Sequence, residues 1–364
     1  MEKAAIPLHQ VFWMFVCSRF ILNLVSNPFF NELANDRDII PALIIGVPVQ
    51  LIYAVPFLLL WLKYPERSLI EYSSSILGRF LGKIVGLLYI GYFLMQTAIT
   101  VRFFDDFLVT RFFYHTPMEA IGLGLLVIVV YAVYMGVEVI GRCASVLVPV
   151  IFFGMLLLVA LAFSQAHGYN VAPTWETSPG EFMITMLPTA TRWSELAWTA
   201  VLFPLIRKRQ NIKPAVFGGI IFVNFLFFIV NVSVVAIFGP VSVKNIRFPT
   251  LEMVQSVSVG EFLDRVESLV LGLWVFGAFV KTAIFFYVCV QCVTEWFKLK
   301  DRKPLIIPMG IIVYLLSILL FSNIVELSIF SGTVIPIDFA FTFLLPLLML
   351  LIYFVKKPFQ KRSS

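Results

Sequence analysis

The stretch that decides the fold is GEFLDRVESLVLGLWVFGAFVKTAIFFYVCVQCVTE, residues 260–295. It starts with a charged cluster and continues as an apolar run that one lysine, Lys281, interrupts near its middle. At about 1.5 Å per residue, a helix over this stretch is roughly 45 to 50 Å long, more than the ~30 Å hydrocarbon core of a bilayer needs. We therefore expect a membrane-spanning helix with Lys281 close to the membrane midplane.

An ammonium group at that depth is costly, by about 3 kcal/mol on insertion scales and more in simulations. A lysine near the end of a span can reach the interface, but from the middle its side chain is too short. We therefore expect Lys281 to face protein or water, as a functional or charge-paired group. Gly277, one turn earlier, leaves room for a neighbouring backbone.

The composition excludes a soluble domain, because 60% of the residues are hydrophobic and only 13% are charged. The four cysteines lie in apolar runs without metal or disulfide spacing. The net charge of +6 comes from short loops between spans and is no sign of nucleic-acid binding. The first apolar run is too long for a cleavable signal peptide and leads into further spans.

The hydropathy pattern predicts an all-α, polytopic protein with one membrane domain over residues 1–364 and both termini in the cytoplasm. Eighteen lysines and arginines fall on one side of the predicted spans and four on the other, and the basic side is the cytoplasmic one by the positive-inside rule. The ten expected spans cover roughly 8–30, 39–62, 82–109, 118–136, 142–164, 180–206, 214–238, 264–297, 304–322 and 332–355.

Polar residues interrupt the first and sixth of these spans. Cys17-Ser18-Arg19 breaks the first apolar run, and a segment with Pro188 breaks the sixth. Broken spans at corresponding positions of two five-span halves indicate an inverted-repeat transporter fold with a substrate site at the midplane. The candidate ligand-binding residues at the two breaks are Ser18, Arg19, Asn23, Thr191, Arg192 and Glu195.

Each break carries an arginine, Arg19 or Arg192. Two guanidinium groups beside exposed helix-end amides suit a carboxylate or another anionic group. The alternative is structural pairing or gating, since Arg192 stands three residues before Glu195 on a helical turn.

Two further spans carry polar residues at depth. Tyr92 and Gln96 share one face of the third span with Thr100, a pattern that lines a cavity rather than meets lipid. Asp338 is a deep acidic residue in the tenth span, and pairing with Lys281 is one option. The candidates for coupling or gating are Lys281, Asp338 and Glu267, the last from the charged cluster before the eighth span.

Nothing in the sequence predicts an enzyme. The three histidines lie far apart near the ends of spans, and the chain has no phosphate-binding glycine loop, HExxH or GxSxG motif. We expect no catalytic residues, cofactor or metal.

Three stretches carry a family resemblance. FLDRVESLVLGLWVFGAFVK (residues 262–281) resembles the hallmark of the endospore germination permeases, the B subunits of GerA-type spore germinant receptors. MGVEVIGRCASVLVPV (135–150) and LKYPERSLIEY with LGRFLGK (62–83) agree with it, so the resemblance covers nearly the whole chain.

The resemblance implies the amino acid–polyamine–organocation superfamily, a five-plus-five inverted repeat with broken helices one and six, and a place in the spore inner membrane. It also implies two partners, a membrane A subunit and a lipoprotein C subunit, and a role in sensing a small nutrient such as an amino acid, nucleoside or sugar. Superfamily members usually have glycines at the two breaks. This chain has Ser18-Arg19 and Arg192-Trp193, which points to a different ligand or a degenerate site.

The favoured interpretation is a receptor subunit that binds a nutrient between spans one and six, against spans three and eight, and signals by a shift between conformers. Lys281 then replaces the cation that sodium-coupled relatives bind between spans one and eight. The alternatives are a proton- or cation-coupled amino-acid transporter, and a scaffold without a ligand of its own.

Overall fold

The computed structural model describes residues 6–25, 38–173, 175, 177–183, 192–243, 245–246, 248–256, 266–321 and 324–360. Regular structure in these residues is helical apart from one isolated parallel bridge between Ile6 and Ile206. The helices are α1 Leu8–Val25, α2 Ile39–Tyr53, α3 Val55–Lys63, α4 Leu69–Leu77, α5 Arg79–Arg111, α6 Met118–Met135, α7 Val137–Ala162, α9 Ser194–Leu202, α10 Ile212–Phe238, α11 Pro240–Val243, α12 Pro249–Gln255, α13 Val266–Trp296, α14 Lys303–Leu319, α15 Ile324–Phe339 and α16 Leu345–Gln360.

Seven helical segments are long and apolar enough to cross a membrane, and they correspond to seven of the ten predicted spans. The shorter apolar helices Ser194–Leu205 and Lys303–Leu319 match the described part of the sixth span and the ninth span. α1 matches the described part of the first span. The chain is thus an all-α, multi-pass membrane protein. The seven long segments are Ile40–Lys63, Arg79–Arg111, Met118–Met135, Val137–Gln165, Arg209–Phe238, Ser268–Trp296 and Val334–Lys356.

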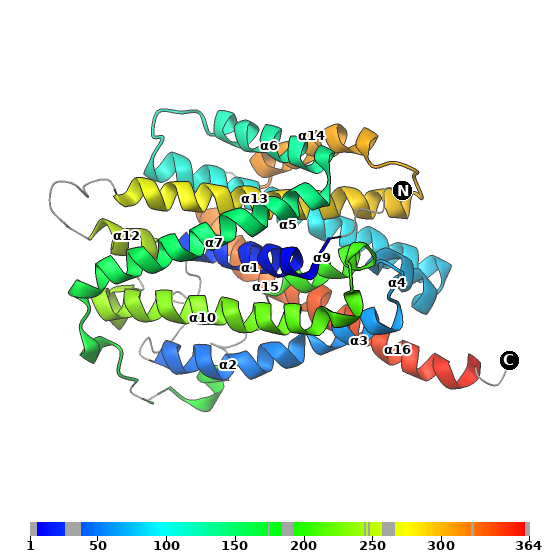
Figure 1. Cartoon of the computed structure of the whole chain (residues 1–364), viewed down its shortest axis with the longest axis horizontal. Coiled ribbons are helices and arrows are strands. Elements are labelled where there is room, and N and C mark those ends of the chain that lie inside the picture. Colours follow the sequence, from blue (N-terminus) through cyan, green and yellow to red (C-terminus); the bar gives the residue numbers. More distant parts are fainter. Residues whose placement is uncertain are drawn as a thin grey trace.

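The helix α13 runs through the middle of the bundle, with α1, α5, α6 and α7 packed around it (Figure 1). Its residues from Val280 to Cys292 are almost all buried, which explains why the sequence is apolar on every side. Gly277 permits the crossing of α1, because a Cβ atom there would lie 2.2 Å from the Ile21 side chain. The space at Gly277 is filled by the Ile21 side chain of α1, whereas the sequence had suggested a neighbouring backbone.

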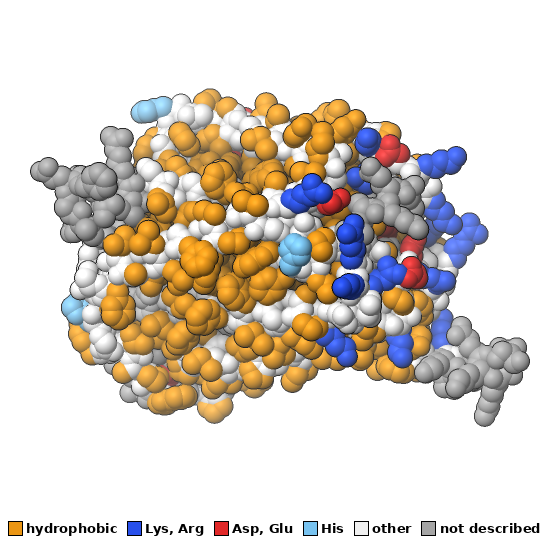
Figure 2. All heavy atoms as spheres, viewed as in Figure 1, with side chains coloured by type: hydrophobic (Ala, Val, Ile, Leu, Met, Phe, Trp, Pro, Cys, Tyr) orange, Lys and Arg blue, Asp and Glu red, His pale blue; other side chains and the backbone are white. Residues whose placement is uncertain are grey.

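The surface divides into an apolar belt and a basic end. Figure 2 shows hydrophobic side chains over most of one face and lysines and arginines gathered at the end where the chain terminates in Figure 1. Many large apolar residues of the membrane-spanning helices are exposed, among them Phe80, Val127 and Phe153. Such a belt suits contact with lipid tails, while the basic end suits contact with headgroups and water.

The short helix α4 precedes α5, the helix of the third span. Ser68 and Glu71 form a capping box at its start, which satisfies backbone amides that the helix itself leaves free. Gly78 then turns the chain into α5 with φ = 91°, a conformation that favours glycine. α4 packs closely against α5, since a Cβ atom at Gly82 would lie 2.3 Å from the Ser74 Cα. A second short helix, α12, runs from Pro249 to Gln255.

Candidate functional site

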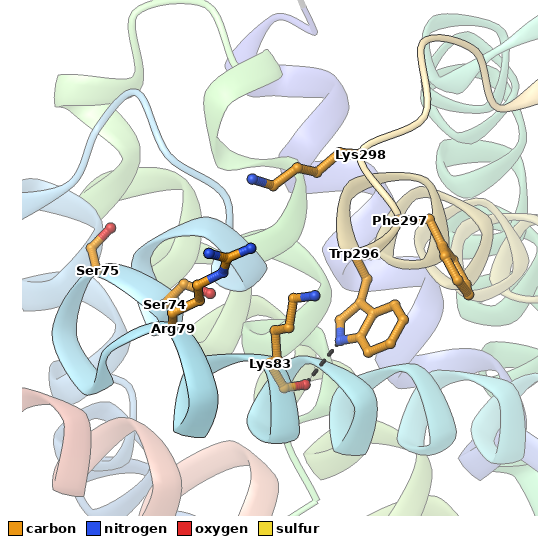
Figure 3. A pocket seen from close by; sticks show the side chains of 7 residues that line it. All are labelled: Ser74, Ser75, Arg79, Lys83, Trp296, Phe297 and Lys298. Carbon is orange, nitrogen blue, oxygen red and sulfur yellow. Dashed lines mark hydrogen bonds between the residues drawn. The ribbon is translucent and has the colours of Figure 1, made fainter.

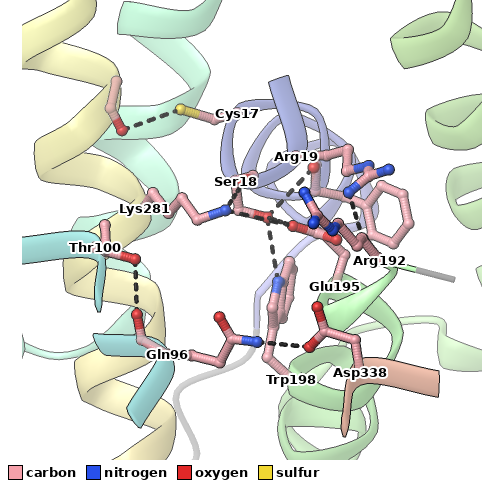
Figure 4. A network of polar contacts seen from close by, with 12 residues as sticks. Cys17, Ser18, Arg19, Gln96, Thr100, Arg192, Glu195, Trp198, Lys281 and Asp338 are labelled. Atoms are coloured by element: carbon pink, nitrogen blue, oxygen red, sulfur yellow. Dashed lines mark hydrogen bonds and ion pairs between the residues drawn. The ribbon is translucent and has the colours of Figure 1, made fainter. Parts of the chain in front are cut away.

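A buried polar cluster joins α1, α9 and α13 at the centre of the bundle (Figure 4). Lys281 stands halfway along α13 and donates a hydrogen bond of 2.5 Å from its Nζ to the Ser18 carbonyl oxygen. The same Nζ lies 3.9 Å from Oε1 of Glu195. Ser18 donates from its Oγ to that same Oε1 at 3.2 Å. The prediction that Lys281 faces protein rather than lipid is confirmed.

The cluster is closed by Trp198, one turn after Glu195 on α9. Its Nε1 donates to the Ser18 Oγ at 3.2 Å. Ser18, Glu195 and Trp198 are each at most 1% exposed, and Lys281 is 9% exposed. Trp198 was not among the predicted site residues, although its position three residues after Glu195 places both on one helical face.

Glu195 is the ion partner of Lys281, and no ion pair joins Lys281 to Asp338 among the described residues. The suggested Lys281–Asp338 pairing is therefore wrong. The second carboxylate oxygen of Glu195, Oε2, is buried and has no hydrogen-bond partner in the described part of the chain. A buried acceptor without a donor is costly, so a ligand that donates to it would be bound favourably.

Asp338 belongs to a neighbouring group of polar side chains. Its Oδ1 accepts hydrogen bonds from the Tyr92 hydroxyl at 2.8 Å and from Gln96 Nε2 at 2.7 Å, both on α5. The backbone oxygen of Asp338 accepts from Thr342 Oγ1, which also bonds to the Tyr53 hydroxyl. A π-helical turn, Ala340–Leu344, presents Thr342 at this point. The structure thus brings together the candidates Tyr92, Gln96 and Asp338.

Arg19 holds the chain segment that leads into α9. Its guanidinium donates to the backbone oxygen of Arg192 and lies 4.8 Å from the centre of the Trp193 ring. Arg192 and Trp193 are not helical, and α9 starts only at Ser194, which agrees with an interruption of the sixth span. Arg19 therefore positions this interruption, whatever else it contacts.

The interruption predicted at Cys17-Ser18-Arg19 is wrong at that position. α1 is one continuous helix from Leu8 to Val25, because its polar groups find partners without leaving the helix. The Phe15 oxygen, 3.4 Å from Ser18 Oγ, is an alternative acceptor to Glu195 for the hydroxyl proton of Ser18, and Cys17 Sγ donates to the Gly277 oxygen at 3.6 Å.

Three candidates cannot be placed as side chains. Thr191 lies outside the described residues. Asn23 belongs to α1 and Glu267 to α13, but their side chains are not among those described. Their predicted roles stay predictions.

The two polar groups together contain three cationic and two anionic side chains (Figure 4). The site is thus rich in charge, with a formal excess of one positive charge and one unsatisfied carboxylate oxygen on Glu195. This combination suits a small ligand that carries both an acidic group and a donor such as an ammonium. The five side chains are Arg19, Arg192, Lys281, Glu195 and Asp338.

A family model described as spore germination protein matches residues 38–325. The chain belongs to the spore germination protein family. Spore germination protein KB of Bacillus subtilis (strain 168) is 27% identical over all of this chain and 98% of its own length. Spore germination protein YndE of the same organism is 27% identical over 80% of each chain. Spore germination protein XB of Bacillus anthracis is 24% identical over 71% of each. The resemblance seen in the sequence is confirmed.

Solved transporters share the fold of this spore germination protein. A substrate-bound, outward-open Na⁺-coupled sialic acid symporter has a TM-score of 0.67 at 11% identity, over 93% of this chain and 78% of its own. MhsT in complex with L-phenylalanine has a TM-score of 0.63 at 14% identity, over 91% and 87%. At such identities the likeness shows the fold alone. The ten-helix inverted repeat is consistent with it, and these neighbours are transporters rather than enzymes.

Proposed function

We propose that this chain is the membrane-embedded, nutrient-sensing subunit of a spore germinant receptor. Family membership supports the germination role, and the transporter fold supports a small-molecule site in the bundle. The observation that carries the proposal is the unsatisfied Oε2 of Glu195, buried beside Lys281 and Ser18 where α1, α9 and α13 meet. A buried carboxylate oxygen without a donor destabilises the fold, and a scaffold without a ligand would gain nothing in return.

The proposed ligand is an amino acid or a similar zwitterion. Its ammonium would donate to Glu195 Oε2, and its carboxylate would be held by the positive charge of the surrounding cations. Gln96 and Asp338 lie beside this place in Figure 4. Together with Tyr92, which donates to Asp338, they would contact the rest of the ligand.

Lys281 has the role of a built-in cation in this proposal. Its Nζ contacts a backbone oxygen of α1 and a carboxylate of α9, as a bound metal ion would. Since the ammonium is covalently attached, the link between α13 and α1 needs no sodium. Ligand binding at Glu195 would compete with Lys281 for the same carboxylate and so change the contact between α9 and α13. That differential contact is what shifts a conformational equilibrium.

The proposal includes the spore inner membrane, or the cytoplasmic membrane, with both termini on the cytoplasmic side. The basic end in Figure 2 supports this orientation through the positive-inside rule. A membrane A subunit and a lipoprotein C subunit are the proposed partners, because the curated relatives are spore germination proteins of the same type. They would read out the conformer of this subunit.

The test is germination on single nutrients with the gene deleted and then restored, with uptake of the same nutrients followed in growing cells. Loss of germination on one defined nutrient with unchanged uptake is expected. Lost uptake with intact germination would instead establish a coupled amino-acid transporter, the second candidate, which the symporter fold favours. The experiment uses a strain without other germinant receptors, so that none of them responds to the same nutrient in place of this one.

A further inference from the structure

A basic pocket opens at the end of the bundle where α4, α5 and the end of α13 meet (Figure 3). Its volume is about 550 Å³, and its walls include Ser74, Arg79, Lys83, Trp296 and Lys298. Figure 3 shows the Arg79 guanidinium and the Lys83 and Lys298 ammonium groups extending into the same space. The pocket is remote from the buried cluster around Lys281, which lies about four turns earlier on α13.

Among the described residues, the three cations of this pocket have no carboxylate partner. No acidic residue is among those that line the pocket, and neither Arg79 nor Lys83 nor Lys298 forms an ion pair with a described residue. The nearby carboxylate of Glu295 is already occupied, since it accepts from the Ser68 hydroxyl and, at 2.8 Å, from Gln291 Nε2. Three like charges that share one space favour an anion there.

The pocket walls are held in place independently of any ligand. Trp296 Nε1 donates a 2.9 Å hydrogen bond to the Lys83 backbone oxygen and so fixes the end of α13 against α5. The Lys83 Nζ lies 5.3 Å from the centre of the Trp296 ring, a cation–π distance. Lys298 follows with φ = 56°, a conformation that lysine seldom adopts and that ends the helix at the pocket.

Two features of the surroundings indicate what kind of anion fits. α5 begins at Arg79 without a side-chain cap, so the free amides at the start of a 33-residue helix add to the positive potential. Phe297 lines the pocket and is 61% exposed, and Phe80 and Leu81, which follow Arg79 in the chain, are 78% and 54% exposed. The pocket therefore lies where the apolar belt of the surface meets the basic end.

We propose that this pocket binds a phosphate group. The group would be held by Arg79, Lys83 and Lys298, and would come either from an anionic phospholipid headgroup at the basic end or from free phosphate. Guanidinium and ammonium groups are the usual protein ligands of phosphate, and a lipid would place its acyl chains along Phe80 and Leu81.

The experiment uses the full chain purified in nanodiscs that contain phosphatidylglycerol and phosphatidylcholine. Native mass spectrometry after release into detergent measures how much of each lipid stays bound. The test variant is R79Q/K83Q/K298Q. The control is R207Q/K213Q/K300Q, which removes the same charges from the same end without touching the pocket. We expect retained phosphatidylglycerol to fall about tenfold or more in the test variant, as the loss of charge-assisted contacts implies, and to change little in the control.

A second arm separates the sources of phosphate. Inorganic phosphate at millimolar concentration is added to protein in a lipid-free neutral detergent, and the shift in melting temperature is measured against chloride at equal ionic strength. A shift that the test variant loses, without selective lipid retention, assigns the pocket to free phosphate. Equal lipid retention in both variants together with no phosphate shift would overturn the proposal. If the triple variant does not elute as a monodisperse protein, both measurements are repeated with the single variant K298Q.

Discussion

Two lysines on or next to α13 stand in opposite surroundings. Lys281, in the middle of the helix, is 9% exposed and contacts both Ser18 and Glu195. Lys298, just past the end, is exposed and has no ion partner among the described residues. A charge deep in the bundle needs partners, because its desolvation is costly. At the basic end, water solvates a charge in the absence of a ligand. The same residue type thus has buried partners in one place and, in our proposal, binds an anion in the other.

The two surroundings also predict different losses of folding stability when the charge is removed. Removing one partner of a buried pair leaves an uncompensated charge and costs about 3 to 5 kcal/mol. Removing an exposed charge usually changes stability by no more than about 0.5 kcal/mol. The expected effect of a substitution therefore decreases from the buried cluster around Lys281 to the end of α13.

Lys281→Met carries the largest expected effect. Glu195 would lose its cationic partner and, among the described residues, keep the Ser18 hydroxyl as its one donor, so the stability of the folded protein should fall by about 3 to 5 kcal/mol. The melting temperature in detergent measures this, and the germination response should be lost as well. The double variant K281M/E195Q, which removes both charges, should recover most of the stability. Normal stability and a normal nutrient response in K281M would disprove the built-in cation role.

Glu195→Gln separates ligand binding from folding. A glutamine keeps an oxygen for Ser18 and Lys281 and replaces the unsatisfied Oε2 by an N–H donor, which repels a ligand ammonium. We expect the nutrient concentration for half-maximal germination to rise about 10- to 100-fold, from the loss of one charge-assisted hydrogen bond. The matched control is Glu138→Gln, which removes an exposed carboxylate from the surface pair with Arg142. Equal responses of both variants would remove Glu195 from the ligand site.

Asp338→Asn should have a smaller effect on stability, about 1 kcal/mol, because the amide oxygen still accepts from Tyr92 and Gln96. Asp338→Ala should cost more, since it leaves both buried donors without an acceptor. Melting temperatures of the two variants give the comparison. If the asparagine and alanine variants melt alike, the hydrogen bonds at Asp338 contribute nothing to the fold.

The sequence predicted the long spans and the middle position of Lys281 because hydrophobicity and helix length are local properties. It did not predict which carboxylate meets Lys281, since Glu195 and Asp338 were both deep acidic residues and only the crossing of α1, α9 and α13 decides between them. The break expected at Ser18 was wrong for a similar reason. Whether a polar helical residue interrupts a span depends on partners, and Ser18 finds them on α9 and α13.

The basic pocket was beyond sequence reasoning altogether. Nothing local in the sequence indicates that the end of α13 lies against the start of α5. The hydrogen bond from Trp296 to the Lys83 oxygen makes that contact, across two segments that are far apart in the chain. Charge clusters formed in this way become visible only in three dimensions.

Lys298→Gln should change stability least of these variants, and it tests the contrast between Lys281 and Lys298 directly. Stability should stay within about 0.5 kcal/mol of wild type, with the sign towards stabilisation, because one of three neighbouring like charges disappears. The gain should shrink as salt is raised from about 10 mM to 1 M, since screening weakens exposed charges. Melting curves at both salt concentrations measure it, with Lys300→Gln as the control in the same loop. A loss as large as that of Lys281→Met would mean that Lys298 has a structural partner after all, and the contrast between the two lysines would fail.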